Sequence, residues 1–200
     1  RNTKLLWGIG IFCLLFVAIG GGYYFSSYFT EKNNRVAAPA VQNQVGIDTK
    51  TTVSAAVSSV SPAVVNDFRI YVQAKERFNS SIIELATQVN GRLGQDAGLR
   101  YSHDLRNRAS GLVNEITQYN NQLAAKQYPV EMQNSKVLLQ QLLDLEMTRA
   151  RSLYNGLTEG INGQNFQSSF SVGTSAAYQF DEVNGRFVQE YGNINAKGTL

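Results

Sequence analysis

The sequence has little of what enzymes, metal proteins and haem proteins use. Its 200 residues include one histidine, His103, and one cysteine, Cys13. It has no Glu-x-x-His pair, no Cys-x-x-Cys pair, no Gly-x-Ser-x-Gly turn and no Gly-x-x-x-x-Gly-Lys loop. These patterns build di-iron, haem, zinc, serine-nucleophile and phosphate sites. A single imidazole is also a poor supply of general base. We therefore expect no metal, no cofactor and no enzymatic activity.

The larger part of the chain also lacks an excess of charge of either sign. Residues 61–200 hold 13 Lys plus Arg and 13 Asp plus Glu, so the net charge of +3 comes from residues 1–60. A surface that binds nucleic acid needs clustered basic side chains to neutralise phosphates. We therefore expect no nucleic-acid partner.

One long hydrophobic run stands out. No charged side chain occurs from Leu5 to Phe25, a stretch of 21 residues. A helix of this length measures ~31 Å, close to the ~30 Å hydrocarbon core of a bilayer. Trp7 lies near its start and Tyr28 follows its end, where amphipathic rings favour the membrane interfaces. The pattern predicts a cytoplasmic stub at residues 1–4 and a transmembrane helix at residues 5–28, which meets the lipid bilayer through residues 5–25.

A cleaved signal peptide is the alternative interpretation, because Arg1 and Lys4 precede the run and small residues lie within it. The run is longer than the usual apolar core of a signal, which favours a retained anchor. Residues 26–200 contain no cysteine, which suits an extracytoplasmic domain. We expect a single-pass membrane protein with a cytoplasmic N-terminus and its bulk outside, in the periplasm or on the cell surface.

Residues 29–60 are small and polar and show no sustained helical or strand period. They predict a flexible linker. Pro62 would break a helix that ran back through it. The domain that follows is therefore expected to begin at residue 61.

Capping residues delimit the first two of four predicted helices. Ser61 is the expected cap and Pro62 the first helical residue of the first helix, which ends in the glycines of residues 91–98. The second helix begins near Ser102. It stops at residues 126–129, because proline disfavours helix at the residue before it.

The third and fourth helices have clear apolar faces. The third opens at Pro129 and ends at Gly160 and Gly163, and its wide apolar face predicts that it is the most buried. The fourth follows a seam from Phe166 to Tyr191 in alternating steps of four and three. That spacing is typical of helices that pack as antiparallel bundles.

Together these segments predict an all-α protein, with a single N-terminal transmembrane helix followed by an up-down-up-down four-helix bundle over residues 61–200. The alternative is a three-helix bundle whose fourth helix is swapped to a second molecule. Gly173 and Ala177 are small seam residues of the fourth helix. They would let a neighbouring helix come close, in this chain or in a second copy.

Two polar residues interrupt the apolar seams, Lys75 in the first helix and Asn184 in the fourth. Lys75 either extends along the apolar face to keep its amine in water, or lines an internal ligand pocket. Asn184 either fixes the register of the helices or lines the same pocket. Tyr71 and Tyr119 are the other predicted pocket-lining residues. Glu146 and Arg149, three residues apart, are expected to form a surface ion pair.

A partner-binding tip is predicted where the first and second helices connect, next to the connection between the third and fourth. Functional residues concentrate on loops that a rigid scaffold holds. The candidate residues combine basic side chains with apolar ones expected to be exposed: Arg92, Leu99, Arg100, Tyr101, His103, Arg106 and Ile161.

The sequence thus predicts a non-enzymatic, membrane-anchored helical bundle. Its expected function is binding or scaffolding, as an accessory subunit of an envelope or surface assembly, with a protein partner or with copies of itself. The alternative is an extracytoplasmic ligand-sensing or carrier bundle with a small internal pocket.

Overall fold

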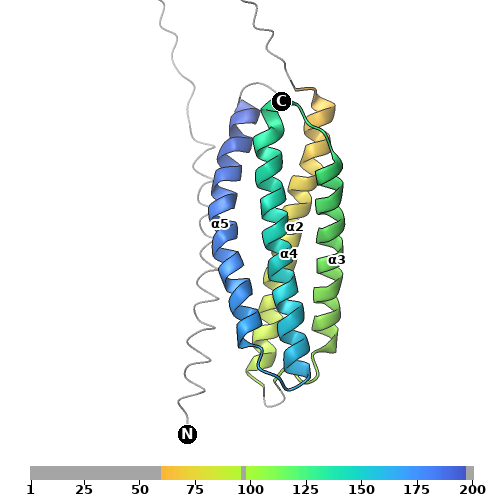
Figure 1. The fold of residues 1–200 in the computed structure, drawn as a ribbon, viewed down its shortest axis with the longest axis vertical. Coiled ribbons are helices and arrows are strands. Elements are labelled where there is room, and N and C mark those ends of the chain that lie inside the picture. The colour runs from red at the N-terminus through yellow and green to blue at the C-terminus, as the bar shows by residue number, and fades with distance from the viewer. Residues whose placement is uncertain (1–59, 96–97, 197–200) are drawn as a thin grey trace, which may run out of the picture.

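The computed structural model describes residues 60–95 and 98–196, and this part of the chain is all-helical without strands. Four long antiparallel helices follow one another as α2 Pro62–Leu93, α3 His103–Ala125, α4 Gln133–Ile161 and α5 Gln167–Ala196 (Figure 1). A 3-10 turn, η1 Val130–Met132, precedes α4. The expected four-helix bundle is confirmed for these residues.

The predicted stub, transmembrane helix and most of the linker lie outside the described residues, which begin at residue 60. Within the described part, no helix combines the length and the apolar character needed to cross a bilayer.

The helix ends follow the capping signals of the sequence. The Ser61 hydroxyl accepts a hydrogen bond from the Val64 amide, and Pro62 is the first residue of α2. The α3 helix ends at Ala125, before Pro129 as expected. The α4 helix begins at Gln133 rather than at Pro129, because this proline starts a 3-10 turn that comes first. Gly163 has a φ of 70°, a left-handed conformation that glycine adopts without steric cost. These residues set the lengths of the helices and hold their connections short.

The α4 helix is the centre of the bundle. It packs against α2, α3 and α5, whereas close backbone approaches between α2 and α5 are few. Its apolar face is buried, as the sequence predicts for the third helix, and the α5 helix packs on it within the same chain rather than being swapped. The buried apolar residues of α4 are Leu139, Leu142, Leu143, Ala150, Leu153 and Leu157.

The contact between α4 and α5 depends on two glycines. A Cβ atom added to Gly156 would collide with the ring of Phe170, and one added to Gly173 would collide with the side chain of Ser152. The expectation that Gly173 lets a neighbouring helix come close is confirmed. The Ser152 hydroxyl also donates a hydrogen bond to the backbone carbonyl of Ser169 across this contact.

The two ends of the bundle differ. We call the end that holds the α2–α3 and α4–α5 connections the tip, and the end that holds the start of α2 and the α3–α4 connection the base (Figure 1). At the base, Asp67 accepts hydrogen bonds from the Lys126 amine at 2.6 Å and from the Tyr128 hydroxyl at 2.7 Å. These contacts tie α2 to the α3–α4 connection.

Candidate functional site

The structure brings together two of the four predicted pocket-lining residues. The Lys75 amine donates a hydrogen bond to Asn184 Oδ1 at 2.8 Å and lies 2.6 Å from Glu76 Oε1. The Lys75 side chain is 1% exposed and lies near the faces of Phe180 and Phe187. The interpretation that Lys75 extends into water is therefore wrong, because the rings of α5 enclose its amine.

The other two predicted pocket-lining residues form a separate contact. The rings of Tyr71 and Tyr119 meet edge to face, with centroids 6.2 Å apart, and Tyr119 also packs against Phe78. Burial raises the pKa of the Tyr71 hydroxyl. This aromatic contact joins α2 to α3, whereas Lys75 and Asn184 join α2 to α5.

The interior also contains Glu146, whose predicted place on the surface is wrong. Its side chain is 0% exposed, and neither carboxyl oxygen has a hydrogen-bond partner among the described residues. Burial raises the pKa of this carboxyl group well above its usual value, and the nearby charges of Arg149 and Lys75 offset only part of that effect. Burial therefore shifts the balance of this group towards the protonated, uncharged form.

The expected partner of Glu146 is buried as well and points elsewhere. Arg149 Nη1 donates a hydrogen bond to Asn79 Oδ1 at 2.8 Å, and its guanidinium lies over the ring of Phe180. Burial lowers the pKa of Arg149. Partial burial raises the pKa of Asp181, against the opposing effect of Arg149. Arg149 thus links α4 to α2 and α5 instead of pairing along its own helix.

Together these side chains form an interior polar cluster, which we define as Lys75, Asn79, Glu146, Arg149 and Asn184. The three charged residues are buried and the two asparagines are half-buried. The cluster draws on α2, α4 and α5 near the middle of each helix. Each cation donates to a neutral amide, and Lys75 also pairs with the exposed carboxylate of Glu76. The carboxyl group of Glu146 has no hydrogen-bond partner within the described ranges. Buried polar groups are normally hydrogen-bonded, so an exception calls for an explanation.

The sequence contains a signal for Glu146 that spacing alone reveals. Glu146 follows Leu139 by seven residues and precedes Leu153 by seven, which places it on the apolar seam of α4. The three-residue spacing between Glu146 and Arg149 also fits a surface ion pair. Interpreting it in that way led us to overlook that Glu146 lies on the apolar seam.

The predicted tip residues do gather at one end of the bundle, but not all are exposed. Leu99 is buried, and a Cβ atom on Gly160 would collide with it, so the expectation that Leu99 is exposed is wrong. Its role is to pack the α2–α3 connection against the end of α4. Ile161 is half-buried.

The basic residues of the tip divide into paired and exposed ones. Arg92 Nη2 lies 3.3 Å from Asp104 Oδ2, and Arg106 donates to Asn107. By contrast, Arg100 and His103 are exposed, and their side chains make no hydrogen bond or ion pair with the other described residues.

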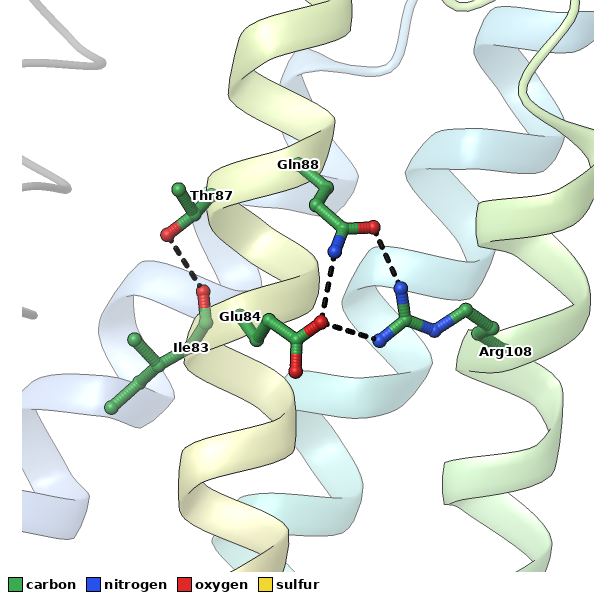
Figure 2. Close-up of polar contacts among 5 residues, drawn as sticks. All are labelled: Ile83, Glu84, Thr87, Gln88 and Arg108. Carbon is green, nitrogen blue, oxygen red and sulfur yellow. Dashed lines mark hydrogen bonds and ion pairs between the residues drawn. The ribbon is translucent and has the colours of Figure 1, made fainter.

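Further along the same two helices, Figure 2 shows Arg108 of α3 reaching both Glu84 and Gln88 of α2. Its guanidinium donates to Gln88 Oε1 at 2.6 Å and to Glu84 Oε1 at 3.1 Å. Gln88 also donates to Glu84 at 2.9 Å. In this network the Arg108 guanidinium is already bound, and it holds α2 beside α3.

The described residues hold no group of three or more His, Cys, Asp or Glu side chains suited to a metal ion. Comparisons with protein-family models, with curated proteins and with solved structures give no match for this chain.

Proposed function

We propose that this protein is a non-enzymatic, membrane-anchored binding module. An anchor at residues 5–25 holds an extracytoplasmic bundle, and the tip of the bundle binds a protein partner within an envelope or surface assembly. The observation that carries the proposal is Tyr101, which is 67% exposed although Leu99 and Ser102 on either side of it are buried.

The local arrangement supports binding at this place. Arg100, Tyr101 and His103 are exposed, while Leu99 and Ser102 between and beside them are buried. A buried residue on each side of Arg100 and Tyr101 fixes the backbone. These two side chains would therefore lose little conformational entropy on binding a partner. Tyrosine and arginine are enriched among the residues that dominate protein interfaces.

The test is a gentle detergent extraction of the full chain from its native membrane, followed by size and mass analysis. We expect other chains to co-purify, and the R100A/Y101A double variant to lose them. Val130 is 80% exposed at the base, so V130A is a matched control that should keep them. A lone monomer from the wild type, or equal retention by both variants, would contradict the proposal.

A second candidate is a ligand-sensing or carrier bundle, favoured by the contact between Lys75 and Asn184 beside the unpaired Glu146. Native mass spectrometry of the extracted full chain should then show a retained small molecule, which Lys75→Met should release. A chain of bare protein mass would count against this candidate.

A further inference from the structure

Glu146 is the most enclosed ionisable group among the described residues. Its side chain is 0% exposed and neither oxygen has a partner within hydrogen-bond distance in the described part of the chain. A carboxylate here has no donor to replace the water it leaves behind, whereas a neutral carboxyl group loses far less on burial. The site as built therefore suits the protonated form.

Cations lie near Glu146 but are held by other groups. Neither Lys75 nor Arg149 comes within ion-pair distance of it, although both act on it electrostatically. The Lys75 amine is committed to Asn184 and to the carboxylate of Glu76. If Glu146 lost its proton, its buried carboxylate would be an alternative partner for Lys75 and for Arg149.

The remaining charged groups around this site come from the flanking helices. Asp181 on α5 interacts with Arg149, which is committed to Asn79. On α3, Glu115 is paired with Arg77 at the surface. The α3 side of α4 is otherwise met by uncharged contacts such as the hydroxyl of Thr117 on the Met147 sulfur.

We propose that Glu146 is the proton-binding group of a conformational switch in the bundle. With its proton bound, the carboxyl group stays in the interior, and Lys75 and Arg149 keep their amide partners. As the pH rises, the proton passes to solvent and the carboxylate draws the Lys75 amine away from Asn184, which loosens the seam between α2 and α5. This seam is the one to open, because side chains rather than close backbone packing bridge it. The inference goes beyond the proposed binding function.

The test compares thermal unfolding of the detergent-solubilised full chain with that of Glu146→Gln, an uncharged variant of the same shape. We expect E146Q to raise the Tm by about 5 °C at about pH 7.5 and by less than about 2 °C at about pH 4.5. Glu182 is exposed on α5, so E182Q is the matched control and should change the Tm little at either pH. A pH-independent difference between E146Q and wild type would overturn the proposal.

Two further readouts separate a switch from a merely buried acid. Hydrogen exchange of residues 72–79 and 180–187, corrected for intrinsic rates, should rise in the wild type at the higher pH and not in E146Q. Unchanged exchange would overturn the switch even if the Tm shifted. Should E146Q fail to fold, the carbon-13 shift of the Glu146 carboxyl in the wild-type chain gives its titration directly, and a titration near the usual Glu range would refute the idea.

Discussion

At the scale of single residues, the bundle holds two buried cations with amide side chains of other helices. Lys75 meets Asn184 of α5, and Arg149 meets Asn79 of α2. An amide oxygen accepts a hydrogen bond without balancing the positive charge, although Lys75 also lies 2.6 Å from the Glu76 carboxylate. The amide contacts themselves therefore contribute less stability than apolar packing would. These contacts instead fix how the helices are aligned, because each hydrogen bond can form in only one register of its two helices.

Replacing Lys75 by methionine tests this interpretation. Methionine keeps much of the volume but removes the donor, which leaves Asn184 Oδ1 without its hydrogen bond. We expect K75M to lower the free energy of unfolding by about 1–2 kcal/mol, measured by urea denaturation.

A double-mutant cycle supplies the control for that substitution. In the K75M/N184L variant both polar partners are gone, so the loss should be smaller than the sum of the two single losses. Strict additivity would show that the hydrogen bond between Lys75 and Asn184 contributes nothing.

At the scale of helices, α4 and α5 can pack closely because glycine occupies the points where a side chain would collide. Gly173→Ala places a methyl group against the Ser152 side chain. We expect a loss of about 1–3 kcal/mol from overpacking, although alanine favours helix over glycine by about 0.5–1 kcal/mol. Gly185 of the same helix has no atom within 4 Å of an added Cβ, so G185A should stabilise the protein instead. Equal effects of the two substitutions, in the same urea experiment, would refute the explanation.

The base of the bundle should respond to acid through Asp67. Hydrogen bonds from Lys126 and, to a lesser extent, Tyr128 lower the pKa of this carboxyl below its usual value. A lowered folded pKa gives stability that is present above the unfolded value and is lost as the pH falls through the folded one.

The corresponding variant is Asp67→Asn. Near neutral pH we expect it to cost about 1 kcal/mol, mostly through the Tyr128 hydrogen bond, since a solvent-exposed pair with Lys126 contributes little. The difference from wild type should shrink as the pH drops below the unfolded pKa. Chemical denaturation over a range of pH would show this, and a gap that persists in acid would exclude the ionised carboxylate as its source.

The same scale shows what the sequence could predict. Helix ends were predictable because Ser61, Pro62, Pro129 and Gly163 act locally, through capping and backbone conformation. The burial of Glu146 was not, because a charged residue on a seam is decided by how helices distant in sequence pack around it.

The tip, too, was only partly predictable from the sequence. Its residues were predictable as neighbours from helix order alone, since an up-down bundle brings alternate connections together. The burial of Leu99 depends on its fit against Gly160, a contact between connections far apart in the chain that no periodic pattern reports.

At the scale of the whole molecule, the described part is built around one helix. Because α4 packs against all three others, a change on α4 reaches every neighbour directly, whereas close backbone contacts between α3 and α5 are few. Glu146 and Arg149 of the interior polar cluster lie on this central helix, and the tip lies at one end of the helices that meet it. A loosened α2–α5 seam would therefore alter the spacing of the connections at the tip.

The first turn of α2 and the last turn of α5 lie at the same end of the bundle (Figure 1). The order of the helices along the chain could therefore be changed while the fold is kept. A short glycine-rich bridge between those two turns would join the four helices into a closed ring. The ring could be reopened at residues 162–165, where the connection is exposed. Such a circular permutant should keep the helical circular dichroism of the original, with its free ends moved to the opposite pole.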